Sequence, residues 1–171
     1  GMIEKCAMGH NVYEETLQVP LIISQPGLVK SGQSCSDLAE MFDLYPTLIE
    51  LADLDLPSTK LGIDATSLVP TLTKGASTNR KYVVSENWSQ ASVITEKYKL
   101  GIWLDPTEYA KERDYRSFGD MLFDRENDPN ELLNEINNPD YQDIRHQLLA
   151  NYDDFVARVS AAGKNELVQK S

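Results

Sequence analysis

The chain has 171 residues, 41% of them hydrophobic, which suits one domain of ordinary size with a real core and argues against disorder. Its formal net charge of -11, from 16 basic and 27 acidic residues, argues against a nucleic-acid partner, because phosphate binding needs clustered Lys and Arg. No apolar run approaches the ~20 residues of a membrane span, so no membrane partner is expected.

The first half of the chain predicts loops around one strand and one helix. Residues 1–16 lack a clear period and are expected to form a loop that approaches a site. The apolar run at 19–24, ended by Pro26 and Gly27, predicts a strand buried on both faces, as in α/β sheets. Apolar residues then recur at helical spacing, which predicts a helix from about Asp43, as its cap, to Asp53. Residues 57–80 are rich in turn formers and form a connector, with a short helical turn at 67–72.

The second half predicts a sheet followed by a helix. Short β-rich runs separated by turn residues predict an antiparallel meander, with strands at 82–85, 91–95, 98–103 and 121–123. Pro139 stands like a first helical residue after Asn138, and one apolar face then continues to Gly163. A long amphipathic helix that covers one side of the meander is the simplest packing. The predicted division is a partial α/β segment at 1–75 and a sheet and helix subdomain at 76–171.

Three segments, in this order, resemble parts of sulfatases of the alkaline phosphatase superfamily. Residues 13–27 resemble the passage that leaves the active site and enters a buried strand, residues 43–52 resemble the D-L-x-P-T-L-L-x-L-A helix, and residues 121–131 resemble the L-Y-D-L-x-x-D-P-x-E segment. The resemblance covers nearly all of this chain but only the C-terminal third or so of a sulfatase. It implies an α/β fold: the C-terminal part of an alkaline-phosphatase-like sheet, joined to a small antiparallel sheet that is packed by a C-terminal helix.

The same resemblance implies hydrolysis of a sulfate ester by a hydrated formylglycine on a calcium ion. Sulfatases form that nucleophile within a C/S-x-P/A-x-R signature, and neither Cys6 nor Cys35 lies in one. The family's calcium ligands, an Asp-Asp pair and a D-H/N-G turn, are also missing from these residues. We therefore expect no catalytic residue and no metal site in the chain, and calcium and formylglycine only in a complete enzyme. We expect the chain to be inactive alone.

The expected partners follow from the missing groups. They are an N-terminal catalytic module or a second copy of the chain, and in a complete enzyme a sulfated small molecule or glycan. Sulfatases of this kind are commonly exported, so the full-length parent is expected to be exported or periplasmic.

The loop before Tyr13 holds two candidates for binding the sulfate. In sulfatases a basic residue about four positions before this Tyr contacts the sulfate, because a fixed cation stabilises the charge that grows on the sulfuryl oxygens. That position is Gly9 here, so Lys5 or His10 could serve only if the loop is rearranged. The alternative is a solvated loop lysine and a turn histidine.

Glu86, Asn87 and Trp88 are candidates for binding the organic part of a substrate. They follow an apolar run, and the resemblance places their subdomain over the pocket. An aromatic ring beside an amide and a carboxylate suits stacking on a sugar or aryl ring. The alternative is that Trp88 packs in the core or lies in a surface loop.

Two acidic groups are more simply structural. Of the adjacent Glu14 and Glu15, one is expected to hold the loop by hydrogen bonds while the other faces solvent. Asp124, Asp128 and Glu131 could suggest a calcium loop, but an EF-hand needs ligands at alternate positions and a central Gly, and this run has Pro129 instead. A capped turn is therefore expected there.

Two other functions stay open on the sequence. The chain could be a non-catalytic binding or interaction module that keeps the sulfatase scaffold. It could also be part of a phosphate or phosphonate ester hydrolase of the same superfamily, because the discriminating residues lie upstream.

Overall fold

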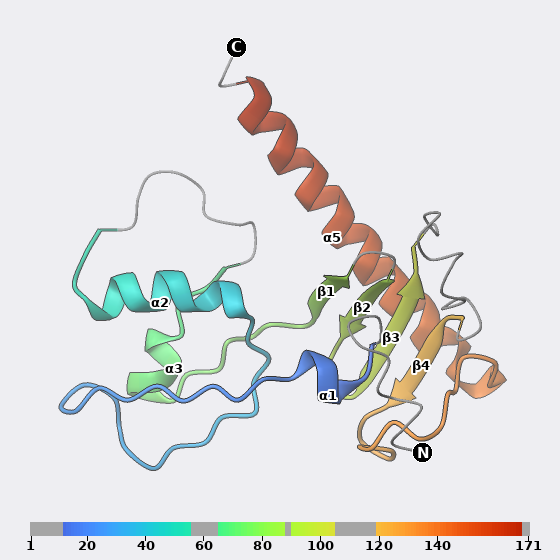
Figure 1. Cartoon of the computed structure of the whole chain (residues 1–171), viewed down its shortest axis with the longest axis horizontal. Helices are drawn as coiled ribbons and strands as arrows, with labels where there is room; N and C mark the ends of the chain where they lie inside the picture. Colours follow the sequence, from blue (N-terminus) through green and yellow to red (C-terminus); the bar gives the residue numbers. More distant parts are fainter. Residues whose placement is uncertain (1–11, 56–64, 88–89, 105–118, 169–171) are drawn as a thin grey trace. The chain divides into compact units, whose positions relative to one another are not determined.

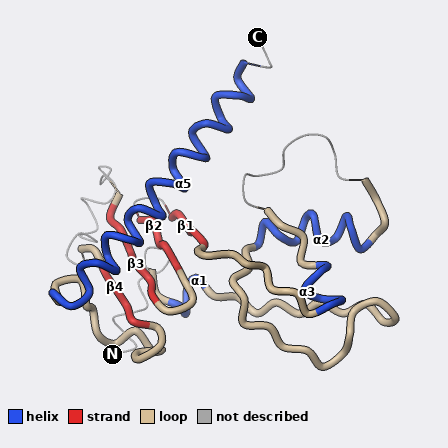
Figure 2. Tube along the Cα trace, turned by 180° about the vertical axis from the view of Figure 1, so that it is seen from behind, coloured by secondary structure: helices blue, strands red, loops and turns tan. Residues whose placement is uncertain are grey.

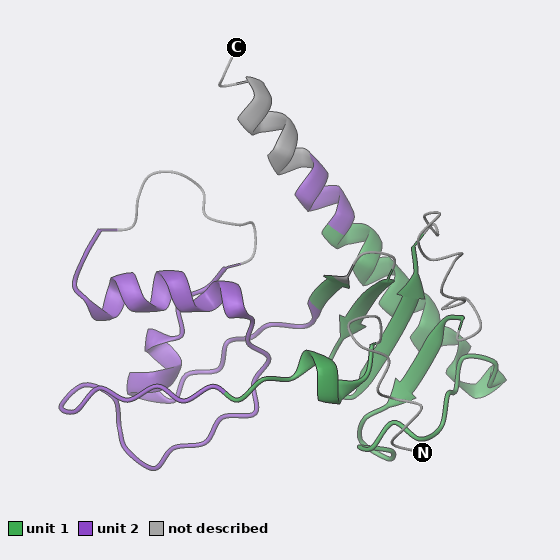
Figure 3. Cartoon of the chain, viewed as in Figure 1, with its two compact units in different colours: residues 1–20, 84–155 green, residues 21–83, 156–171 purple. Residues whose placement is uncertain are grey.

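A computed structural model of the chain describes residues 12–55, 65–87, 90–104 and 119–168. The chain divides into two compact units (Figure 3). Residues 1–20 and 84–155 form one, which we call the sheet unit, and residues 21–83 and 156–171 form the other, which we call the helical unit. The division between residues 75 and 76 expected from the sequence stays a prediction. None of the helices in the described ranges is both long and apolar enough to cross a membrane.

The sheet unit is built on a four-stranded sheet of order β1-β2-β3-β4 (Figure 1). Its strands are β1 Val83–Asn87, β2 Gln90–Ile94, β3 Tyr98–Trp103 and β4 Met121–Asp124. Strand β2 pairs antiparallel with β3, and β3 pairs antiparallel with β4. The meander predicted from the sequence is thus confirmed for β2 to β4.

One face of the sheet is covered by the first half of α5, Gln142–Val168 (Figure 2). Side chains alternate between the two faces of a strand, so Val93, Leu100 and Leu122, which stand opposite one another in the register, share this face. All three are almost fully buried, as is Leu148 of α5. The amphipathic helix predicted to pack on the meander is therefore confirmed.

The start of α5 follows the predicted pattern. Pro139 opens a short 3-10 helix, η3 Pro139–Tyr141, and the Asn138 side chain accepts a hydrogen bond from the amide of Asp140. The helix runs past Gly163, where the sequence predicted its end. A glycine inside a helix costs only about 1 kcal/mol relative to alanine, so it need not end one.

The opposite face of the sheet is covered by the segment that leads into α1, Glu14–Leu17. Val12 is 3% exposed and packs with Met121 and Phe123, and the rings of Tyr13 and Phe123 lie 5.6 Å apart. Gly101 makes this approach possible: a Cβ atom added there would lie 2.6 Å from Cγ2 of Val12. The chain needs a glycine at this point of β3 so that residue 12 can lie directly on the sheet.

The strand predicted at 19–24 is wrong. These residues form no strand, and Ile22 is 90% exposed and Val19 55% exposed. A strand needs a neighbour that pairs with its backbone N–H and C=O groups, and within the described ranges no other segment pairs with this one. The run is apolar, but an apolar run forms a strand only where another strand pairs with its backbone. Residues 14–16, expected in a loop, instead begin α1.

The helical unit carries η1 Met41–Asp43, α2 Leu44–Leu51 and α3 Val69–Lys74. The helix predicted from about 43 to 53 is confirmed to within two residues. The helical turn predicted at 67–72 is present with its bounds shifted by two residues.

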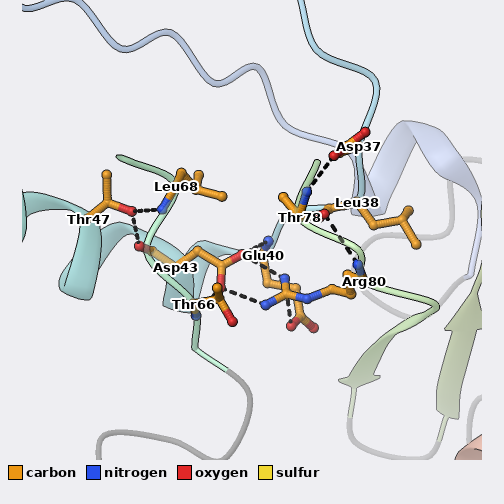
Figure 4. Close-up of polar contacts among 9 residues, drawn as sticks. All are labelled: Asp37, Leu38, Glu40, Asp43, Thr47, Thr66, Leu68, Thr78 and Arg80. Atoms are coloured by element: carbon orange, nitrogen blue, oxygen red, sulfur yellow. Dashed lines mark hydrogen bonds and ion pairs between the residues drawn. The ribbon is translucent and has the colours of Figure 1, made fainter. Parts of the chain in front are cut away.

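Asp43 ties α2 to the connector that follows it (Figure 4). Its carboxylate is fully buried and accepts hydrogen bonds from both terminal nitrogens of Arg80, at 2.6 and 2.8 Å. The backbone amides of Thr66 and Glu40 donate to the same carboxylate at 2.8 Å each. Burial raises the pKa of Asp43, but the guanidinium of Arg80 and the two amides outweigh it, so the pKa is lowered overall. The residue expected to cap α2 is therefore the centre of an ionic contact.

The close approach of Val12 to Gly101 can be tested by stability. Replacement of Gly101 by Ala places a methyl group inside the Val12 side chain, and we expect a loss of about 1–3 kcal/mol in the free energy of unfolding, measured by urea denaturation. Val12→Ala in the same background should recover part of this loss. An equal cost of Gly101→Ala with and without Val12→Ala would contradict the packing of residue 12 on β3.

Candidate functional site

The structure places few of the five predicted substrate-binding residues. Lys5, His10 and Trp88 lie outside the described residues, and Asn87 is described only as the last residue of β1. Glu86 is exposed on β1, and its Oε1 atom accepts a hydrogen bond of 2.8 Å from the hydroxyl of Tyr152. Convergence of the five on one site therefore stays a prediction.

Tyr152 of α5 is a neighbour of Glu86 that the sequence did not single out. Burial of the phenol, followed by the Glu86 carboxylate, raises the pKa of Tyr152 to about 12. The hydroxyl thus stays protonated and donates at neutral pH. The ring also stacks on Phe155, with centroids 6.4 Å apart. This contact fixes the side chain of Glu86 at the end of β1 where the other two candidates follow.

A second group of charged residues lies on the Val12 face of the sheet, and we call Glu14, Lys99, Arg125 and Glu131 the Lys99 cluster. The side chain of Lys99 is fully buried, with its ammonium 3.0 Å from Oε2 of Glu14 and in contact with Oε1 of Glu131. Arg125 binds the other oxygen of Glu14 at 2.8 Å. Two carboxylates are thus matched by two cations, which is the condition for burying charge at tolerable cost.

The Lys99 cluster attaches α1 to the sheet. The backbone amide of Glu14 donates a hydrogen bond of 2.9 Å to Oε2 of Glu131, in addition to the two ion pairs of the Glu14 side chain. Glu131 is 3% exposed and has a φ of 53°, a conformation uncommon outside glycine that persists only where the surroundings enforce it. Contacts from β3, from the turn after β4 and from the loop at 131 therefore converge on the first residue of α1.

The charges of the cluster make its stability depend on pH. Burial raises the pKa of Glu14, but Lys99 and Arg125 lower it by more, so the pKa lies below its ordinary value of 4.5. A carboxyl group with a depressed pKa stabilises the folded state above its unfolded pKa. The cluster therefore contributes fully at neutral pH, and its contribution is lost as the pH falls below about 4.5 and through the lowered pKa.

The adjacent acidic pair behaves as the simpler interpretation predicted. Glu14 holds its loop by ion pairs and hydrogen bonds, and Glu15 is exposed. Sequence reasoning identified neither Lys99 nor Arg125. The local pattern carried no signal, because a lysine next to Leu100 fits the polar-apolar alternation of a strand with one solvated face.

The acidic run after β4 forms a capped turn. The carboxylate of Asp124 accepts hydrogen bonds from the amides of Glu126 and Asn127 at 3.1 and 3.0 Å, and from the hydroxyl of Tyr141 at 2.9 Å. Asp128 accepts from the amide of Leu133 at 2.8 Å. The capped turn predicted for this run is confirmed. Across the described ranges no three His, Cys, Asp or Glu side chains gather where they could hold a metal ion.

The chain matches the family model described as N-sulphoglucosamine sulphohydrolase, C-terminal, over residues 9–157. The chain belongs to this family. It is therefore a sulfatase C-terminal domain. The match includes α1, α2, the whole sheet and the part of α5 that packs on it.

Curated relatives agree with this assignment. The chain is 32% identical over 150 residues to a Delta 4,5-hexuronate-2-O-sulfatase of Bacteroides thetaiotaomicron, a match that covers 85% of the chain and 30% of the relative. It is 30% identical over 129 residues to arylsulfatase K of Xenopus laevis, which covers 72% of the chain and 23% of the relative. The sulfatase C-terminal domain thus spans less than a third of the length of these proteins.

Solved structures support the fold. A protein solved in complex with its substrate D-glucosamine-2-N,6-O-disulfate aligns with a TM-score of 0.64 at 19% identity, over 80% of this chain and 27% of that one. A 2-O glycosaminoglycan sulfatase aligns with a TM-score of 0.52 at 28% identity, over 72% of this chain and 26% of that one. The fold class expected from the sequence is confirmed: a C-terminal part of an alkaline-phosphatase-like fold, with a small antiparallel sheet and a C-terminal helix.

The contribution of the Lys99 cluster to the free energy of unfolding can be tested by removing the ammonium group of Lys99. Lys99→Met leaves the buried carboxylate of Glu131 and the partly buried carboxylate of Glu14 with one cation, and we expect a loss of about 3–5 kcal/mol in the free energy of unfolding, measured by urea denaturation. Lys97→Met is the matched control, because Lys97 lies two residues earlier and its ion pair with Glu126 is on the surface. The control should cost far less. Equal losses for the two variants would show that the Lys99 cluster does not anchor α1.

Proposed function

We propose that this chain is the C-terminal part of a sulfuric ester hydrolase and that it does not hydrolyse sulfate esters by itself. The observation that carries the proposal is the match to the sulfatase C-terminal family over residues 9–157. Within the sheet unit, the Lys99 cluster fixes Glu14, in the segment that resembles the sulfatase passage leaving the active site, to the sheet whose β1 carries Glu86.

The proposed roles follow the charge of the substrate. Lys5 or His10, in the loop before α1, supplies the cation for the sulfate, and Glu86, Asn87 and Trp88 contact the organic part. The formylglycine nucleophile and the calcium ion come from a catalytic module outside this chain. The residues of this chain bind and orient the ester. Sulfated sugars are the proposed substrates, supported by the names of the hexuronate sulfatase and the glycosaminoglycan sulfatase.

A chimera tests this function. The chain replaces the matched 150 residues of the Bacteroides thetaiotaomicron hexuronate sulfatase, and hydrolysis is measured on an aryl sulfate, a sulfated disaccharide and an aryl phosphate. We expect sulfate release by the chimera and none by the chain alone, with or without calcium, because the nucleophile and metal are contributed by the other part. Turnover by the repurified chain alone would refute the proposal. Preference for the phosphate ester would place the domain with the phosphoesterases, and a folded chimera without activity would favour a non-catalytic module.

The role of Trp88 in substrate binding can be tested with the same chimera. Trp88→Ala in the chimera should lower kcat/KM for the disaccharide by about fivefold or more and leave the aryl sulfate almost unchanged if Trp88 stacks on the sugar. Equal losses on both substrates, with a lower melting temperature, would show that Trp88 packs in the core.

A further inference from the structure

Four buried side-chain atoms in the described ranges have no hydrogen-bond partner: Oε1 of Gln90, Nε1 of Trp103, Oε1 of Glu131 and Nε of Arg145. Two of them have a simple account, because the Glu131 oxygen contacts the Lys99 ammonium and the Arg145 side chain is 40% exposed. Gln90 and Trp103 have none. A buried polar atom without a partner loses its hydrogen bond to water and gains nothing in return, so folded chains keep few of them.

These two residues lie side by side at one end of the sheet. Gln90 is the first residue of β2, Trp103 is the last residue of β3, and they stand directly opposite each other in the register. Cross-strand partners point to the same face, and alternate residues of a strand share a face, so both lie on the face of Gly101, which Val12 covers. Gln90 is 4% exposed. The backbone amide of Trp103 donates a hydrogen bond of 3.0 Å to Oδ1 of Asp120, which fixes the end of β3.

The connection between β1 and β2 borders this pair on one side. Asn87 is the last residue of β1, and only residues 88 and 89 separate it from Gln90 in the sequence. Two residues of chain span at most about 7 Å, so Trp88, proposed to contact the organic part of the substrate, cannot lie far from Gln90.

The N-terminal segment approaches the pair from the other side. Glu14 contacts Lys99, and Val12 lies on Gly101. Followed back from α1, the chain thus advances along β3 towards Trp103. The segment proposed to bind the sulfate directly precedes Val12 in the sequence.

The two unpartnered atoms are complementary to one kind of ligand group. An indole N–H only donates a hydrogen bond, and an amide oxygen only accepts. A hydroxyl group does both, so a single hydroxyl can satisfy Gln90 and Trp103 together. A carboxylate or sulfate oxygen would repel the Gln90 oxygen, and an ammonium would leave the Trp103 N–H without an acceptor.

We propose that Gln90 and Trp103 bind a hydroxyl group of the substrate sugar, an inference that rests on the proposed function. Sugars carry hydroxyls on most ring carbons, whereas the ring of a simple aryl sulfate carries none. A substrate without the hydroxyl leaves both protein atoms unpaired, which is how a buried polar pair discriminates between substrates. A water molecule offers the same chemistry, and the experiments separate it from the sugar.

Kinetics of the chimera with the hexuronate sulfatase test the substrate role. Gln90→Met and Trp103→Phe each remove one polar atom and keep a side chain of similar shape. We expect each variant to lower kcat/KM for the sulfated disaccharide by about fivefold or more and to leave that for the aryl sulfate almost unchanged. Equal losses on the two substrates, or no loss on either, would overturn the proposal.

The stability of the isolated chain tests whether the site is free of an internal partner. Gln90→Met removes a buried acceptor that has no donor, so it should raise the Tm by about 2 °C or more. Gln147→Met is the matched control, because Gln147 is exposed on α5, and it should leave the Tm almost unchanged. A lower Tm for Gln90→Met would show that a water molecule or the chain itself already satisfies Gln90, and it would contradict the proposal.

Ligand binding separates this proposal from the proposed function. The indole N–H resonance of Trp103, assigned by its absence in Trp103→Phe, should move when the isolated chain is titrated with the sulfated disaccharide and stay in place with inorganic sulfate. The same movement, together with a chimera that has no sulfatase activity, would support the site and reject the proposed function. A resonance that stays in place up to tens of millimolar disaccharide would overturn the site.

Discussion

The sheet unit depends on how the charge of Lys99 is compensated. An ammonium with no exposure to solvent, on a central strand of a small sheet, would destabilise the fold by several kcal/mol if it were unpaired. Glu14 and Glu131 compensate it, and each comes from a different part of the chain. The position of α1 on the sheet is thus determined by a charge requirement as much as by packing. Gly101, two residues along the same strand, then leaves room for Val12.

In the helical unit, too, a buried charge is compensated by an opposite charge from a distant part of the chain. Asp43 is the buried charge there, and Arg80, 37 residues later in the chain, compensates it. In both units one buried charge selects the conformation of a segment distant in sequence. In the helical unit the consequence is that Asp43 and Thr47 are buried while Met41, Phe42 and Leu48 are exposed.

The elements were largely predictable from the sequence, and their long-range contacts were not. Periodicity identified the strands β2 to β4, the helix after Asp43 and the helix after Pro139, because these features depend on local pattern. The strand predicted at 19–24 was wrong because a buried strand and an exposed apolar loop can have the same composition. Lys99, Arg125 and Tyr152 were missed because ion pairs and hydrogen bonds across 66 to 111 residues leave no trace in local spacing.

Hydrogen exchange at the amide of Glu14 tests the anchoring of α1 most directly. This amide donates to a carboxylate oxygen of Glu131 and not to a helix or strand partner, so its protection reports the Lys99 cluster alone. Native-state exchange followed by NMR should show the Glu14 amide opening with the same free energy as the amide of Leu100 in β3, because the cluster opens only when the sheet does. Exchange of the Glu14 amide at the rate of an unprotected peptide, while Leu100 stays protected, would show that α1 is not held to the sheet.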